Sequence, residues 1–299
     1  MSAATDPIRR RVPLWPLLLL APPLLWLGAL YLGSLLGLLG YGLRAVDDFT
    51  GQVLPGFTLA SFRALFVPSN VDIIRRTVVM AAAVTVACAL IAFPIAQLIA
   101  RSRGPRKATL LLLVTLPLWA SYLVRVYAWR LILAQEGVIR YFADRLGLGG
   151  VLDAVLATPG LGGTSLANSS LGMFLVFVYV WLPYMILPLQ AALERVPASL
   201  MQASADLGAR PAQTFRRVLF PLALPGLAAG SIFTFSLTLG DYIIPSVVGA
   251  PGFFIGQMVY TQQGAANNLP LAAAFSVVPI LIVTAYLGLA RRLGAFDAL

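Results

Sequence analysis

Long stretches without charged residues constrain this 299-residue chain more than any other feature. Residues 12–43, for example, contain no Asp, Glu, Lys or Arg. A helix needs about 20 apolar residues to cross a bilayer, because its backbone groups must be bonded internally where water is absent. Only 11% of all residues are charged and the mean hydropathy is +0.88, whereas about 25% charged residues are usual in a soluble domain. The chain is therefore expected to be an integral membrane protein.

Six segments have the length that a membrane helix requires, so the predicted fold class is an all-α integral membrane protein with six transmembrane helices. The first segment is too long for the core of a signal peptide and is expected to be a retained anchor. Arg125 and Arg130 lie in the later half of the third segment, and Asp241 lies near the end of the fifth. The six segments are residues 12–43, 77–100, 108–134, 171–193, 222–248 and 269–290.

Basic residues are unevenly distributed between the segments that connect these spans. With the N-terminus inside, the cytoplasmic segments hold 13 basic residues and the external loops hold 6, while Arg125 and Arg130 remain within the membrane. The positive-inside rule then places both termini in the cytoplasm. The net charge of +10 thus reflects membrane topology, and no nucleic acid partner is expected.

The residues that the chain lacks exclude several kinds of chemistry. It has no histidine, which excludes a Ser-His hydrolase, histidine-ligated haem and the usual zinc sites. Lys107 is the only lysine and belongs to no phosphate-binding loop motif, so any ATP must be bound by another subunit. Cys88 lies in an apolar run and is expected to be a small buried side chain. No catalytic residue, metal ligand or bound cofactor is predicted for this chain.

Residues 194–221, between the fourth and fifth predicted spans, are patterned as two short helices around a turn. Pro197 can start the first helix, and Gly208 can end it because glycine readily adopts the left-handed closing conformation. Pro211 then lies early in a second helix, before Pro221 opens the next span. The pattern predicts a compact cytoplasmic knob; an amphipathic helix on the membrane surface is the alternative.

This loop resembles the EAA motif of permease subunits of binding-protein-dependent ABC importers, in which EAA is followed by three residues, Gly, nine residues and I-x-L-P. The spacing is met throughout, with Gln202 in place of the usual Glu and Ser204 in place of an Ala. The resemblance implies a coupling helix that docks in a groove of a partner ATPase and transmits its closure to the membrane helices. The residues assigned to this ATPase-coupling loop are Gln202, Ala203, Ser204, Asp206, Gly208, Ala209 and Pro221.

Three further segments look like those of spermidine/putrescine-type (polyamine) permeases. They are residues 116–139, 239–249 and 270–274. The similarity implies the MetI-like fold of type I ABC importer permeases. It divides the chain into residues 1–76 (tail, first helix and external loop), 77–292 (five-helix transmembrane core with the loop at 194–221) and 293–299 (cytoplasmic tail).

The same resemblance implies a bacterial inner-membrane transporter subunit, not an enzyme, that works by alternating access. Its expected partners are an ATPase dimer that uses ATP and Mg, a second homologous permease or a second copy of this chain, an external solute-binding protein, and membrane lipid. The predicted substrate is a polyamine; an opine or a phosphonate is the alternative within the family. An autonomous secondary transporter is a third possibility, although one intramembrane acid gives it little support.

Asp241 is the single acidic residue within a predicted span, which makes it a candidate for function. Counted from the cytoplasmic starts of their spans, Arg125 and Asp241 lie 17 and 19 residues in, so both are expected near the external mouth. We expect Asp241, with Trp119, Tyr122 and Tyr242, to receive an amine by charge and by cation–π contact. Two structural alternatives pair Asp241 with Arg125 or let each side chain reach the membrane interface.

Overall fold

The computed structural model describes residues 14–47, 50–250 and 252–292. Within this part of the chain the regular structure is helical, apart from one isolated antiparallel bridge between Val46 and Val53. Five described helices are long and apolar enough to cross a membrane, and a bent pair of helices gives a sixth if it is counted as one span. The predicted all-α membrane fold is therefore confirmed. The predicted tail at 293–299 lies outside the described residues.

The first half of the chain forms eight α-helices. They are α1 (Leu14–Leu25), α2 (Gly33–Tyr41), α3 (Ala60–Ala64), α4 (Pro68–Arg101), α5 (Gly104–Trp119), α6 (Tyr122–Ile132), α7 (Val138–Arg145) and α8 (Gly149–Leu156), with a π-helical stretch, Trp26–Leu32, between α1 and α2. The second half adds α9 (Ser170–Glu194), α10 (Ala198–Asp206), α11 (Pro211–Thr214), α12 (Phe220–Gly240), α13 (Ile243–Val247), α14 (Ile255–Gln263) and α15 (Leu269–Arg292), together with a 3₁₀ turn at Leu166–Asn168 and a π-helical stretch at Phe215–Leu219.

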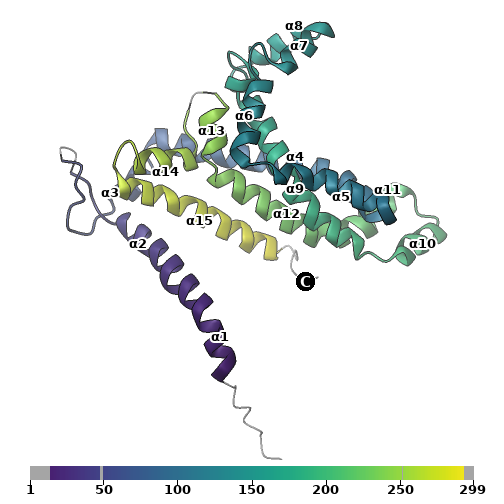
Figure 1. Cartoon of the computed structure of the whole chain (residues 1–299), viewed down its shortest axis with the longest axis horizontal. Helices are drawn as coiled ribbons and strands as arrows, with labels where there is room; N and C mark the ends of the chain where they lie inside the picture. Colours follow the sequence, from purple (N-terminus) through teal and green to yellow (C-terminus); the bar gives the residue numbers. More distant parts are fainter. Residues whose placement is uncertain (1–13, 48–49, 251, 293–299) are drawn as a thin grey trace, which may run out of the picture.

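Three helices, α4, α9 and α12, pack against one another and form the centre of the bundle, and α15 lies along α12 (Figure 1). Small residues of α12 allow the close approach to α9, because a Cβ added at Gly226 would lie 2.6 Å from the carbonyl oxygen of Pro188. The core includes Cys88, which is buried as expected. The bundle places α10 at one end, and α3 and α14 at the other (Figure 1).

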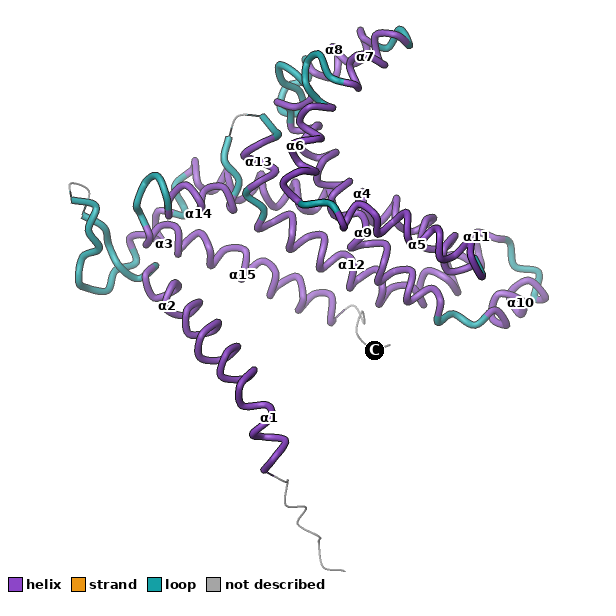
Figure 2. The backbone as a smooth tube through the Cα atoms, viewed as in Figure 1, coloured by secondary structure: helices purple, strands orange, loops and turns teal. Residues whose placement is uncertain are grey.

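Two parts of the chain extend away from this bundle, as the tube in Figure 2 shows. One is the rod formed by α1, the π-helical stretch and α2, whose candidate span Leu18–Tyr41 has no residue buried within the described chain. The other is an arm formed by α6, α7 and α8. Both extensions leave apolar surface uncovered, for example at Trp26 on the rod and Leu131 on the arm.

The second span begins earlier than predicted. Helix α4 starts at Pro68 instead of Thr77, so the expected external loop to residue 76 is partly helical. Proline is favoured at the first helical position, where its missing amide hydrogen is not needed. Arg75 and Arg76 then pair with Asp72 one turn away, which supports the added turns.

The third span is not the continuous helix predicted over 108–134. It consists of α5 and α6, which meet at a bend of 92°. Pro117 lacks an amide hydrogen and weakens the last turn of α5, and Ala120 then adopts an extended conformation with ψ 145°. As a result α5 runs along the bundle, while α6 leaves it and begins the arm (Figure 1).

The fifth span is also shifted relative to the prediction of 222–248. One continuous helix runs from Pro211 to Gly240, so the expected second helix of the loop is the first part of this span and Pro221 lies inside it. The π-helical stretch that ends at Leu219, two residues before Pro221, widens the turn, which relieves the clash between a proline ring and the carbonyl four residues earlier. The helix ends at Gly240, and Asp241 follows in an extended conformation.

Candidate functional site

The loop at 194–221 forms a knob at one end of the bundle, as predicted. Helix α10 ends at Asp206, and Gly208 has a φ of +71°, the left-handed conformation that glycine adopts most readily. The amide of Ala209 donates to the carbonyl oxygen of Ser204 at 3.1 Å and closes the turn. Gln202, Ala203 and Asp206 are exposed, so this surface is open to a partner.

The knob is tied to the following membrane helix by Ser204 and by two side chains that the sequence did not single out, Thr214 and Gln213. Ser204 and Thr214 are both buried, and their hydroxyl oxygens lie 2.8 Å apart. The side-chain oxygen of Gln213 accepts from the amide of Arg210 at 2.9 Å and caps the start of α11. The serine that replaces the motif's alanine therefore connects α10 to the helix that begins at Pro211.

An apolar face of α10 is also left uncovered. Leu200 lies in α10 and Leu207 directly follows its last residue, and both side chains are exposed, Leu207 by 87%. Beside α10 lies a cavity of about 480 Å³ whose polar lining includes Gln97, Arg101 and Gln202. The end of the bundle thus presents an apolar ridge next to a basic hollow, which is suited to contact with another protein.

Two interruptions of membrane helices meet at Asp241. The first lies between α5 and α6, and the second lies between α12 and α13. The hydroxyl of Tyr122, the first residue of α6, donates to Asp241 Oδ2. The other carboxylate oxygen, Oδ1, accepts from the amides of Ile243 at 2.7 Å and Ile244 at 3.1 Å. The carboxylate therefore caps α13 and joins two segments that are 119 residues apart in the sequence.

Arg125 lies over the ring of Tyr122 and does not pair with Asp241. Its side chain is buried, with 9% exposure, and its guanidinium lies 5.9 Å from the centre of the Tyr122 ring. Its Nε and Nη1 atoms make no hydrogen bond to protein, and no ion pair joins Arg125 to Asp241. Of the two structural alternatives, the ion pair between Arg125 and Asp241 does not occur in this structure.

The aromatic residues divide into those that join this cluster and one that does not. Tyr122 stacks on Trp181 of α9 with the ring centroids 5.8 Å apart, and Tyr242 stacks on Tyr260 of α14 with the ring centroids 4.8 Å apart. Trp119, in contrast, is 75% exposed and has no ring partner. Trp181 and Tyr260 were missed from the sequence, where an aromatic residue in an apolar helix gives no sign of whether it faces core, lipid or a site.

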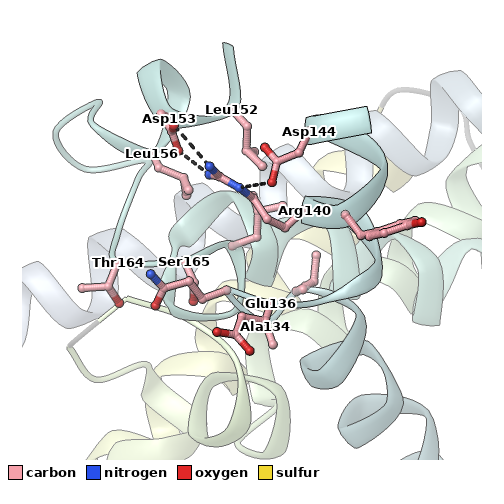
Figure 3. A pocket seen from close by; sticks show the side chains of 13 residues that line it. Ala134, Glu136, Arg140, Asp144, Leu152, Asp153, Leu156, Thr164 and Ser165 are labelled. Carbon is pink, nitrogen blue, oxygen red and sulfur yellow. Dashed lines mark hydrogen bonds and ion pairs between the residues drawn. The ribbon is translucent and has the colours of Figure 1, made fainter. Parts of the chain in front are cut away.

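A second polar region lies on the arm, outside the predicted spans. A cavity of about 530 Å³ opens between α7, α8 and residues 164–166 (Figure 3). Arg140 lies in it and pairs with Asp144 at 3.0 Å and with Asp153, so that one guanidinium joins the two helices of the arm. These two carboxylates stabilise the charged guanidinium and raise the pKa of Arg140.

The helical fold and the two helix interruptions that meet at Asp241 indicate a membrane-transport subunit. Interrupted helices around an intramembrane charge are typical of solute pathways. The family model described as binding-protein-dependent transport system inner membrane component matches residues 14–294, and the chain belongs to this family. It is therefore a permease subunit of an ABC importer, a multi-pass protein of the inner membrane and a transporter component, not an enzyme.

Comparisons with individual proteins agree with this class. The chain is 60% identical over 283 residues to the inner membrane ABC transporter permease protein YdcU of Escherichia coli K12, covering 94% of this chain and 90% of that protein. It is 28% identical over 221 residues to the spermidine/putrescine transport system permease protein PotB of Haemophilus influenzae, covering 74% and 73%. A crystal structure of a bacterial alginate ABC transporter, in complex with an alginate pentasaccharide-bound periplasmic protein, shares the fold with a TM-score of 0.69 at 13% identity, covering 95% and 96%.

Proposed function

We propose that this permease translocates a polyamine of the spermidine/putrescine type, received from an external solute-binding protein. The observation that carries the proposal is the carboxylate of Asp241, held between two helix interruptions by Tyr122 and two backbone amides. No ion pair to Asp241 occurs in the described chain, so its negative charge is not neutralised by a neighbouring cation. A protonated amine supplies the missing positive charge.

The aromatic neighbours suit the same ligand. Tyr122, which bonds to the carboxylate, stacks on Trp181, and Tyr242, the residue after Asp241, stacks on Tyr260. Aromatic rings attract ammonium groups by cation–π interaction. The methylene segments of a polyamine are apolar and pack on aromatic faces. The similarity to relatives named as spermidine/putrescine permeases supports the same substrate class.

Transport depends on ATP and Mg used by a separate ATPase dimer in this proposal. The exposed Leu200 and Leu207 of α10 dock in a groove of the ATPase, and Ser204 passes the movement to the helix that starts at Pro211. ATP closes the ATPase pair and opens the pathway outward to the binding protein, and hydrolysis resets it inward. A second homologous permease or a second copy of this chain completes the pathway, with both termini cytoplasmic.

The test uses the complete transporter, reconstituted in liposomes with its ATPase and binding protein. We expect putrescine to stimulate ATP hydrolysis and to be taken up. Asp241→Asn retains an oxygen that caps Ile243 and Ile244 but removes the charge, so uptake is expected to fall about tenfold or more while the complex still assembles. Asp153→Asn, on the exposed arm, is the matched control and retains uptake.

Three results would contradict the proposal. Full putrescine uptake by Asp241→Asn would remove Asp241 from the pathway. Stimulation by an opine or a phosphonate, with none by polyamines, would replace the substrate class. Uptake by this chain alone in liposomes, without any ATPase, would favour an autonomous secondary transporter.

A further inference from the structure

Neither Arg125 nor Asp241 forms an ion pair within the described chain. Each contacts Tyr122, Arg125 through the ring and Asp241 through the hydroxyl, yet the two charges do not contact each other. A buried guanidinium without a hydrogen-bonded partner is costly, and more so at membrane depth. Because Arg125 and Asp241 both contact Tyr122 without contacting each other, the protein gains stability if the two charges pair in another state.

The geometry of α6 makes that pairing accessible. Tyr122 and Arg125 are three residues apart on one helix, so their side chains project from the same face. A carboxylate that the Tyr122 hydroxyl reaches therefore lies within range of the longer and flexible Arg125 side chain. The hydroxyl occupies Oδ2 of Asp241, while Oδ1 is held by backbone amides of α13. Movement of Tyr122 frees Oδ2 for one new donor.

A second buried donor beside Tyr122 also lacks an acceptor. The indole nitrogen of Trp181, whose ring stacks on Tyr122, makes no hydrogen bond to protein and is buried. Two side chains that contact Tyr122 thus carry donors without acceptors, while the one carboxylate of the cluster is held by Tyr122. Buried polar groups are normally satisfied, so this arrangement is expected to change during the transport cycle.

We propose that Arg125 is an internal counter-cation for Asp241, which competes with the substrate ammonium group for this carboxylate, and that Tyr122 is the positioning residue that keeps them apart in the structure seen here. This inference rests on the proposed function. With Arg125 held away, the second lone pair of Oδ2 accepts the amine beside the Tyr122 hydroxyl. When α6 moves relative to α13, Arg125 replaces the amine at Oδ2 and the substrate leaves. One cation replaces another at the carboxylate during this exchange, so no proton transfer is required.

A double-mutant cycle tests this exchange. Equilibrium binding of radiolabelled putrescine and its maximal uptake rate are measured on the complete transporter, in nanodiscs and in liposomes respectively. Tyr122→Phe removes the hydroxyl and lets Arg125 pair with Asp241, so putrescine binding is expected to weaken about tenfold. Arg125→Gln removes the competitor, so binding tightens several-fold while the uptake rate falls because release is slower. Tyr127→Phe, on the exposed face of the same helix, is the control and changes neither quantity.

The double variant decides between exchange and a structural role. Because Tyr122→Phe weakens binding only through Arg125, the Tyr122→Phe/Arg125→Gln variant is expected to bind putrescine within about twofold of Arg125→Gln alone. Arg125→Lys keeps the charge and is expected to bind putrescine like the wild type. Independent effects of Tyr122→Phe and Arg125→Gln, or weaker binding by Arg125→Gln, would overturn the inference.

The proposed function fails in a different way. If Asp241→Asn binds putrescine as tightly as the wild type, Asp241 is not the amine site and both proposals fall. If Asp241→Asn no longer binds putrescine, but Tyr122→Phe weakens putrescine binding by the same factor with and without Arg125, only the exchange is wrong. A variant that does not assemble is replaced by Arg125→Lys and Tyr122→Trp, for which the exchange model predicts wild-type binding and weakened binding respectively.

Discussion

The hydroxyl oxygens of Ser204 and Thr214 lie 2.8 Å apart between α10 and the first turn of the helix that runs from Pro211 to Gly240. That helix has 30 residues, or about 45 Å at 1.5 Å per residue, and ends one residue before Asp241. Helix α10 and Asp241 are thus attached to the two ends of one continuous helix. A displacement of α10 reaches Asp241 without passing through a flexible loop.

Removing one partner of this hydroxyl pair is expected to cost more than removing both. Ser204→Ala leaves the buried Thr214 hydroxyl without its partner and is expected to destabilise the protein by about 1–3 kcal/mol. Ser204→Ala combined with Thr214→Val removes both polar groups and is expected to cost less than Ser204→Ala alone. The thermal unfolding midpoint of the solubilised chain measures the stability of the single variant and of the double variant. A double variant that is less stable than either single variant would contradict this account.

Gly208 is needed for its backbone conformation, since a Cβ added there meets nothing within 4 Å. Its φ of +71° costs a residue other than glycine roughly 1–2 kcal/mol, less for Asn. Gly208→Val is therefore expected to reduce putrescine-stimulated ATP hydrolysis several-fold, while Gly208→Asn retains most of it. Equal stimulation in both variants would show that the turn conformation is unimportant for coupling.

Gly226 is needed for space instead. A Cβ there would lie 2.5 Å from Ala192 Cβ and 2.6 Å from the Pro188 carbonyl oxygen, so α9 and α12 must move apart. We expect Gly226→Ala to destabilise the solubilised protein by about 1–3 kcal/mol. Gly288→Ala, on α15, meets nothing within 4 Å and is the control. Equal unfolding temperatures for the two variants would contradict the close contact between α9 and α12.

The ion pair between Lys107 and Glu194 is expected to contribute little. The Nζ and Oε1 atoms lie 2.5 Å apart and join the start of α5 to the end of α9, but both side chains are about one-third exposed. Lys107→Met is therefore expected to cost roughly 0.2–1 kcal/mol, and less at high salt. Unfolding curves at two salt concentrations check this, with Arg103→Gln as a basic-loop control. A cost that does not change with salt would mean that Lys107 acts by packing.

The sequence predicted the architecture because membrane helices are determined locally. Apolar length and the distribution of basic residues need no tertiary contact, and the predicted segments at 171–193 and 269–290 agree with α9 and α15 within a few residues. The turn at Gly208 was equally local, since glycine and proline restrict the backbone wherever they occur.

The errors occurred where hydrophobicity continues across a break. Residues 108–134 are apolar enough for one span, and hydropathy alone gives no sign of the 92° bend after Trp119. In the same way, the apolar segment continues past Gly240, although the helix ends there. A helix interruption inside a membrane is tolerated only where protein or a pathway accepts the freed backbone groups, and that surrounding is a tertiary property.

The sequence by itself determined the class of protein, the candidate membrane spans and the turn at Gly208, because these follow from the solubility of short segments and from backbone preferences. It also supplied Asp241 and Tyr122 as members of one expected amine site, and Arg125 as an alternative ion-pair partner of Asp241. Only the tertiary structure decided that Tyr122, and not Arg125, bonds to Asp241, since the two residues are 119 positions apart and meet only when two interrupted helices come together. The partner of a charge is set by packing in three dimensions, which no local pattern encodes.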